Sequence, residues 1–322
     1  MGRSGSCDRL AGAGSHPLRK GSKTSAPGGA CARSASGMKV AILGAGGQLG
    51  RALVARFSEQ GWQVAAWTHA ELDLIDGAAV RRALFMARPD AVVNAAAMTA
   101  VDAAEDRAWL AFAVNADGAM HAAEAAAELG AMFVQVSTDY VFGGEKRAPY
   151  REGDRVNPRN VYGASKRAGE RAVMSVHPGA CIVRTSWLFA PWGKNFFTTM
   201  ARLLQTQPQV RVVDDQLGKP TSCAMLAEGI AALISQEATG VWHLAQPPAV
   251  SWYRFAENIA ARMREAGMPV RAKLVPIPTS AYPTPAVRPP YSVLDCTKIE
   301  ALIALRSWEE DLEQAIDWLA RV

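Results

Sequence analysis

A tyrosine and a lysine stand four residues apart at the start of a helical stretch, in Tyr162-Gly-Ala-Ser-Lys166. Residues i and i+4 lie on one face of a helix, so the phenol and the ammonium can share a pocket. The pair suits ketone reduction, because hydride transfer to carbon leaves an alkoxide that a general acid must protonate. A lysine about 4 Å from a phenol contributes about 4 kcal/mol at an effective dielectric of 20. We therefore expect the pKa of Tyr162 to lie roughly three units below its usual value of about 10.

A hydroxyl-bearing segment, Ser137-Thr138-Asp139-Tyr140, follows the expected strand Met132–Val136. The end of that strand belongs to the carboxyl edge of a parallel sheet, where such folds bind ligands. Thr138 can hydrogen-bond a substrate oxygen and align it. The Tyr-x-x-x-Lys spacing alone is weak evidence, because a helix-start tyrosine beside an exposed lysine is common.

A glycine-rich turn strengthens the chemical interpretation. The segment Gly44-Ala-Gly-Gly47-Gln-Leu-Gly50 directly follows the expected strand Val40–Leu43 and opens a helix. Glycines allow a tight strand-to-helix turn and let a pyrophosphate approach the helix N-terminus. The third glycine permits close packing of the helix on the strand. A plain glycine-rich turn is the alternative, but this context predicts dinucleotide binding.

The cofactor choice depends on the end of the second expected strand, at Trp67-Thr68-His69. An acid there usually binds the adenosine ribose and favours NAD. None stands at that position, since Glu71 and Asp73 come later. We therefore favour NADPH slightly over NADH. Asp73-Leu74 and Asn94–Ala97 fall where loops could flank the adenine and the ribose.

Strand-like and helix-like segments alternate through the first half of the body. Short uninterrupted apolar runs are typical of parallel strands covered on both faces. They are Val40–Leu43, Val64–Trp67, Ala91–Val93, Met132–Val136 and Cys181–Val183. The helical stretches between them are Leu49–Glu59, Gly77–Ala87, Arg107–Leu129 and Tyr162–Val176. This order predicts an α/β fold with a Rossmann-type, doubly wound parallel sheet.

The second half is less regular, and prolines become dense between Pro276 and Pro290. We expect helices at Phe196–Gln205, Ala224–Ser235, Tyr253–Ala266 and Trp308–Leu319. The predicted organisation is an NAD(P)-binding Rossmann domain at 38–186 and a smaller substrate lobe at 187–322. The lobe should be partly interleaved with the sheet.

The net charge of the chain is concentrated near its start. The 322 residues carry a formal charge of +5, and segment 1–37 holds six Lys and Arg against one Asp. The rest is formally neutral, which argues against a nucleic-acid surface. We expect 1–37 to be a disordered basic tail or a mis-assigned start. The sequence has no apolar run of membrane length and no C-x-x-C pair among its five cysteines, so it predicts neither a membrane span nor a metal site.

In order and spacing, seven motifs resemble the dTDP-4-dehydrorhamnose reductase family of extended short-chain dehydrogenases/reductases. They are Leu43-Gly-Ala-Gly-Gly-Gln-Leu-Gly50, Val93-Asn-Ala-Ala-Ala97, Ser137-Thr-Asp-Tyr-Val-Phe142, Asn160-Val-Tyr-Gly-Ala-Ser-Lys166, Arg184-Thr-Ser-Trp187, Asp215-Gln-Leu-Gly-Lys-Pro-Thr221 and Thr284-Pro-Ala-Val-Arg-Pro-Pro-Tyr-Ser292. The resemblance covers 38–322. It implies reduction of the 4-keto group of dTDP-4-dehydro-6-deoxy-L-mannose by NADPH or NADH. The product, dTDP-L-rhamnose, would serve a cell-surface polysaccharide made from cytoplasmic precursors.

The resemblance also implies roles for single residues. Tyr162 would donate the proton, with Lys166 and Thr138 tuning it. Trp187 would pack near the sugar, Thr138 and Asp139 would touch the sugar nucleotide, and Arg288 would bind its diphosphate. The expected cofactor-binding residues are Gly44, Gly47, Gln48, Leu49, Gly50, Asp73, Leu74, Ala97, Met98, Thr99, Tyr162 and Lys166.

Two departures from the family pattern are visible. Some members hold Mg²⁺ at a dimer contact through glutamates, where this chain has Arg51, Ala52 and Ala224. A Mg²⁺-bridged dimer is therefore doubtful, and the protein is expected to be a monomer or a homodimer. Met98 replaces the family's usual histidine, a change that nothing in the sequence explains.

Two alternative functions share this fold. One is a non-catalytic NADP-binding regulatory subunit, like the beta subunit of methionine adenosyltransferase. That protein lacks the Arg-Thr-Ser-Trp run, present here at Arg184–Trp187. The other is a sugar-nucleotide epimerase or dehydratase, in which an acid such as Asp139 would take part.

Overall fold

The centre of the fold is a parallel sheet. The computed structural model describes residues 37–321, so the expectations for 1–36 lie outside the described residues. All five predicted strands are present within that range. They are β1 (Lys39–Leu43), β2 (Gln63–Trp67), β3 (Ala91–Asn94), β4 (Met132–Thr138) and β5 (Cys181–Thr185). A sixth strand, β10 (Gly240–His243), pairs with β5 and was not predicted, because it is short and contains only Val241 and Trp242 as apolar residues.

The strand order in this sheet is β10-β5-β4-β3-β1-β2, and every pair is parallel. The chain winds one way from β1 to β2 and the other way from β1 through β3 to β10. Sheets of this kind bind ligands at the carboxyl edge, near the strand where the winding direction changes. The described helices include none that is long and apolar enough to cross a bilayer.

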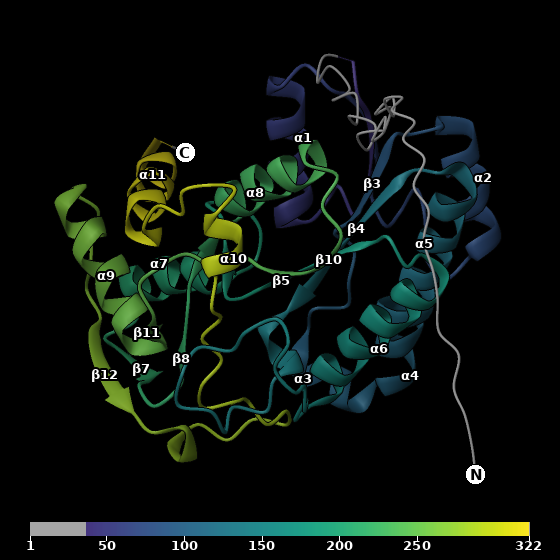
Figure 1. The fold of residues 1–322 in the computed structure, drawn as a ribbon. Helices are drawn as coiled ribbons and strands as arrows, with labels where there is room; N and C mark the ends of the chain where they lie inside the picture. Colours follow the sequence, from purple (N-terminus) through teal and green to yellow (C-terminus); the bar gives the residue numbers. More distant parts are fainter. Residues whose placement is uncertain (1–36, 322) are drawn as a thin grey trace, which may run out of the picture. The chain divides into compact units, whose positions relative to one another are not determined.

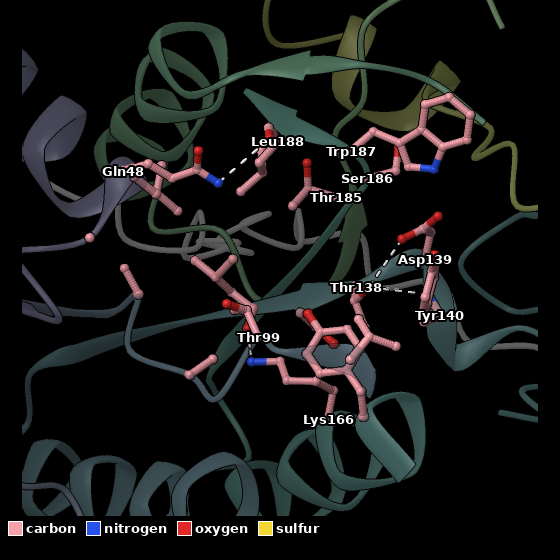
Figure 2. Close-up of a pocket in the computed structure, with 18 of the residues that line it drawn as sticks. Gln48, Thr99, Thr138, Asp139, Tyr140, Lys166, Thr185, Ser186, Trp187 and Leu188 are labelled. Carbon is pink, nitrogen blue, oxygen red and sulfur yellow. Dashed lines mark hydrogen bonds between the residues drawn. The ribbon is translucent and has the colours of Figure 1, made fainter. Parts of the chain in front are cut away.

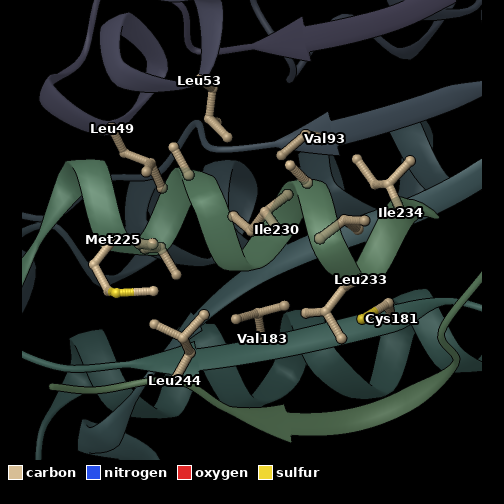
Figure 3. Packing of buried hydrophobic residues seen from close by; sticks show 14 of the residues in the cluster. Leu49, Leu53, Val93, Cys181, Val183, Met225, Ile230, Leu233, Ile234 and Leu244 are labelled. Carbon is tan, nitrogen blue, oxygen red and sulfur yellow. The ribbon is translucent and has the colours of Figure 1, made fainter. Parts of the chain in front are cut away.

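Helices cover both faces of the sheet, as the uninterrupted apolar runs predict. Val40 and Ile42 of β1 pack on the face covered by α1 (Gln48–Glu59) and α8 (Cys223–Ser235). Figure 3 shows α8 with Leu49 and Leu53 of α1 above it. Ala41 and Leu43 pack on the other face. That face is covered by α2 (Gly77–Ala87), α5 (Gly118–Leu129) and α6 (Val161–Val176), as Figure 1 shows. The doubly wound α/β fold is confirmed.

The single helix expected at Arg107–Leu129 is wrong in detail. The chain forms α3 (Val101–Asp106), α4 (Ala108–Phe112), a π-helical turn at Ala113–Asp117 and then α5. A Cβ at Gly169 of α6 would stand 2.1 Å from the carbonyl oxygen of Asn115, so the two helices touch backbone to backbone at this turn. Such local widening is frequent at functional sites, and helix propensity alone does not reveal it.

A lobe with its own core follows the sheet. It contains the predicted helices α7 (Phe196–Thr206), α9 (Trp252–Glu265) and α11 (Trp308–Arg321), with the unpredicted strand pair β7 (Gln209–Val213) and β12 (Lys273–Ile277). The smaller elements are β6 (Leu188–Phe189), β8 (Leu217–Gly218), β9 (Thr221–Ser222), β11 (Val250–Ser251) and α10 (Thr297–Glu300). Because α8 and β10 return to the sheet, the second half is interleaved with the first. The exact domain boundary stays a prediction.

Candidate active site

The glycine turn after β1 has the geometry that an anion-binding turn needs. Gly44 has a φ of +84°, and a Cβ there would stand 2.7 Å from the backbone of Ala96. A Cβ at Gly50 would stand 2.2 Å from the carbonyl oxygen of Gly44. Gly47 is the N-cap of α1 and supplies no capping side chain. The first N–H groups of α1 are therefore free of side-chain caps and suited to a phosphate.

A cavity of about 530 Å³ lies along the carboxyl edge of the sheet, in front of this turn. Its size falls in the usual range for a small-molecule site. Figure 2 shows side chains from the glycine turn, β4, α6 and the segment after β5 around it. Ten predicted site residues line it: Gly47, Gln48, Leu49, Ala97, Thr99, Thr138, Asp139, Tyr162, Lys166 and Trp187.

Five other predicted cofactor residues do not line the cavity. Gly44 and Gly50 lie behind the turn and shape it. The Asp73 carboxylate accepts a hydrogen bond from the Ile75 N–H, and the Leu74 side chain is buried in the core. Met98 is held through its backbone N–H and carbonyl by Asn115, at 2.8 and 3.1 Å.

Arg288 is also outside the residues that line the cavity. Its guanidinium forms a two-pronged ion pair with Asp102 of α3, at 3.0 and 2.8 Å. It also donates to Thr284 Oγ1 and to the Ala286 carbonyl. The sequence could not show this pairing, because Asp102 is 186 residues away. A role on a diphosphate would require Arg288 to exchange this partner.

The electrostatics of the tyrosine and lysine differ from the expectation. Lys166 is buried, and its Nζ donates to the Val136 carbonyl at 2.7 Å. Burial lowers the pKa of Lys166 to about 8, an effect that the Glu170 charge opposes. Burial raises the pKa of Tyr162 to about 12; a hydrogen bond with Thr138 opposes this rise, and the Asp139 charge adds to it. The predicted lowering was therefore wrong, because burial disfavours the charged phenolate and only the hydrogen bond with Thr138 opposes this effect.

Thr138 and Asp139 lie beside the phenol at the end of β4. The Thr138 hydroxyl accepts from the Tyr140 N–H at 3.1 Å and donates to Asp139 Oδ1 at 3.0 Å. Asp139 Oδ2 is buried and has no hydrogen-bond partner among the described residues. Burial raises the pKa of Asp139 to about 7, against hydrogen bonds from Ser292 and Thr138 that lower it. Asp139 lines the cavity, and a buried carboxylate oxygen without a partner suits a hydroxyl donor of a ligand.

A buried ion pair connects the three elements that carry these residues. Both Glu170 oxygens accept from Arg184 at 2.8 Å, and Ser137 Oγ donates to Oε1 at 2.7 Å. Glu170 follows Lys166 by one helical turn, while Ser137 and Arg184 precede Thr138 and Thr185 at the ends of β4 and β5. The Arg-Thr-Ser-Trp run stands out in the sequence, whereas no local pattern marks the Glu170 carboxylate.

Trp187 sits at the other end of the cavity in an uncommon backbone conformation. Its φ is +48°, and its ring stacks on that of Trp252 with a centroid separation of 3.4 Å and an interplanar angle of 7°. A Cβ at Gly218 would stand 2.4 Å from the Trp187 indole, so the glycine of the Asp-Gln-Leu-Gly motif makes room for it. The sequence indicated Trp187, whereas nothing near Trp252 marked it as part of the site.

The carboxyl end of β2 differs from the sequence expectation that no acid stands there. Glu71 Oε2 accepts from both the N–H and the hydroxyl of Thr68, each at 2.8 Å. A carboxylate therefore does stand at the carboxyl end of β2, brought back by a turn. An acid at this place can favour NADH, but this carboxylate is held by its own turn, and the slight preference for NADPH stays a prediction.

Comparisons with known proteins agree with this geometry. The family profile described as "RmlD substrate binding domain" matches residues 38–321. A dTDP-4-dehydrorhamnose reductase of Streptomyces griseus is 44% identical over 85% of this chain and 91% of its own length. The chain belongs to the dTDP-4-dehydrorhamnose reductase family. Bacillus subtilis SpsK, a spore coat polysaccharide biosynthesis protein, is 39% identical over 86% of this chain and 96% of its own.

A solved structure of the family supports a nicotinamide cofactor. The Bacillus anthracis reductase, in complex with NADP, is 36% identical, covers 88% of this chain and 99% of its own, and has a TM-score of 0.83. The cavity of the protein described here fits a nicotinamide cofactor. The Gly44 backbone packs closely on the backbone of Ala96, and buried polar atoms of Gln48 and Thr185 have no partner among the described residues. Within residues 37–321, no three potential metal-ligating side chains lie together.

Proposed function

We propose that this protein reduces the 4-keto group of dTDP-4-dehydro-6-deoxy-L-mannose to give dTDP-L-rhamnose, with NADPH or NADH as the hydride donor. One observation carries the proposal. Thr138, Tyr162 and Lys166 line the same cavity as the glycine turn, at the edge where the family fold binds its ligands.

The reduced nicotinamide would supply hydride to the carbonyl carbon. Tyr162 would then protonate the oxygen, and its raised pKa keeps the phenol protonated at neutral pH. Lys166, with its pKa lowered to about 8, would remain largely charged below that pH and could bind a cofactor ribose hydroxyl. Thr138 would hold the phenol or the substrate oxygen in line, while Asp139 Oδ2 would accept from a sugar hydroxyl.

The sugar-nucleotide end of the site would combine Trp187 with Arg288. The flat Trp187–Trp252 stack offers an apolar face to a sugar ring. Arg288 suits a diphosphate once it leaves Asp102, since a guanidinium fork matches phosphate oxygens. If this is so, Asp102→Asn should tighten binding of the product a few-fold, and Arg288→Lys should weaken it. Cytoplasmic location and a monomeric or homodimeric state remain predictions.

The deciding assay follows NADPH oxidation with the purified protein and the 4-keto sugar nucleotide. Wild type should turn over, and Tyr162→Phe should lose roughly 10²–10⁴-fold in kcat, while NADPH affinity stays close to wild type. Undiminished kcat in that variant would refute the role of Tyr162. A regulatory subunit would bind NADPH without turnover, and an epimerase would convert the sugar without net NADPH loss. Repeating the assay with EDTA tests whether Mg²⁺ matters.

A further inference from the structure

Thr185, the last residue of β5, has a hydroxyl without a partner. It pairs in register with Thr138 of β4 and lines the same cavity. The residue is only 4% exposed, and its Oγ1 has no hydrogen-bond partner among the described residues. Buried hydroxyls are nearly always satisfied, and valine would fill the same space without this cost. A polar ligand atom is the natural partner for such a group.

A second oxygen in the cavity lacks a partner too. Gln48, in the first turn of α1, has a buried Oε1 with no hydrogen bond, while its Nε2 donates to the Leu188 carbonyl at 3.5 Å. Figure 2 shows Gln48, Leu188 and Thr185 along one side of the pocket, opposite Thr99 and Lys166. Two residues that line this side of the cavity therefore each carry a buried oxygen without a partner among the described residues.

The position of these oxygens selects the ligand group. Gln48 belongs to the glycine turn, which suits the cofactor phosphates, whereas Thr185 pairs in register with Thr138, which hydrogen-bonds Tyr162, where a ketone would be protonated. For hydride to reach that ketone, the nicotinamide ring must occupy this stretch. Its carboxamide carries two N–H donors, which need acceptors when water is excluded. The sugar would lie farther along, toward Trp187 and Asp139.

We propose that Thr185 accepts a hydrogen bond from the nicotinamide carboxamide and, with Gln48 Oε1, fixes the orientation of the ring. This inference rests on the proposed function, because it needs a nicotinamide cofactor. Holding the carboxamide on this side determines which face of the ring is turned to the substrate. Thr185 is thus a binding residue that positions the hydride rather than a proton-transfer group.

The test compares ligand binding by wild type and Thr185→Val, which removes the hydroxyl and keeps the shape. NADPH affinity, measured by fluorescence titration, should fall by about 3- to 10-fold, the usual worth of one hydrogen bond. Affinity for 2′-phospho-ADP-ribose, which has no nicotinamide ring, should not change. The 3-acetylpyridine analogue of NADP, in which a methyl group replaces the amide nitrogen, should bind both proteins equally. The ligand-free variant should melt no lower than wild type.

Thr221→Val is the matched control. Thr221 is also fully buried, but its hydroxyl donates to the Lys219 carbonyl and accepts from the Gln246 N–H, and it does not line the cavity. This variant should melt lower and bind NADPH like wild type. If Thr185→Val does not fold, Thr185→Ser and Thr185→Ala provide the same comparison with and without the hydroxyl.

Three results would overturn the inference: unchanged NADPH affinity, an equal loss for 2′-phospho-ADP-ribose, or an equal loss for the acetylpyridine analogue. Failure of the proposed function is separate, because it would appear as wild-type protein that binds no NADPH or does not turn over the sugar nucleotide.

Discussion

Replacing Glu170 by glutamine perturbs the charge balance behind the proposed Tyr–Lys pair. The carboxylate is buried and accepts from Arg184, Ser137 and Arg167. It also raises the pKa of Lys166 against the effect of burial. The substitution therefore acts on stability and on the protonation of Lys166 at once, and the two effects can be measured separately.

The stability change follows from breaking a buried ion pair on one side. Leaving Arg184 without its carboxylate costs about 3–5 kcal/mol. For a domain of this size, roughly 2–4 °C is lost per kcal/mol, so the Tm should fall by roughly 6–20 °C. A fall in Tm alone would show only that Glu170 stabilises the fold.

The change at Lys166 is the diagnostic one. Side chains one helical turn apart, with charges about 6 Å from each other, interact by about 3 kcal/mol at a dielectric of 20, or about two pKa units. Arg184 already cancels part of this attraction, so a net fall of about one to two units is expected. The pKa of Lys166 should then drop from about 8 to near neutrality. The alkaline fall in NADPH affinity and in kcat/KM should move to lower pH by the same amount.

The control is Asp311→Asn. Asp311 of α11 is another buried carboxylate, bonded to Arg306 at 2.6 Å and also to Ser222 and Gln246, and it does not line the active-site cavity. It should lose comparable stability and keep the wild-type pH profile. An unshifted profile in Glu170→Gln, or an equal shift in Asp311→Asn, would refute the reasoning.

Other consequences of the structure can be checked singly. Asp139→Asn should raise the Tm at pH 8 but hardly at pH 4. Because the pKa of Asp139 is raised from 3.8 to about 7, the protonated carboxyl contributes up to about 4 kcal/mol to the free energy of unfolding; this contribution is complete below pH 4 and lost as pH rises through 7. An equal gain at both pH values in thermal melts would contradict this. Glu71→Gln should raise the kcat/KM ratio of NADPH over NADH several-fold, since the carboxylate at the end of β2 repels a 2′-phosphate; steady-state kinetics with both cofactors decides it. Gly50→Ala should abolish cofactor binding or folding, because its Cβ would meet the Gly44 carbonyl at 2.2 Å, whereas Gly153→Ala, with open space at its Cβ and no positive φ, should leave both unchanged in NADPH titrations and thermal melts.

Much of the fold could be predicted from local sequence. Runs such as Val40–Leu43 are apolar at every position, and only a strand covered on both faces buries them all. The start of the helix near Tyr162 is marked in the sequence by Asn160, whose side-chain oxygen accepts a hydrogen bond from the Gly163 N–H at 2.7 Å. Short-range patterns therefore sufficed for the five strands in the described body, and failed where a short strand such as β10 depends on its neighbour β5.

The sequence by itself determined which residues could do chemistry, because the glycine turn and the Tyr–Lys spacing follow from backbone geometry within one turn of chain. Only the tertiary structure decided how those residues behave. The pKa of Tyr162 is set by the packing that excludes water around the phenol, and the partner of Arg288 lies on a distant helix. Desolvation and ion pairing depend on what other segments bring to a site, and such information is absent from any local pattern of residues.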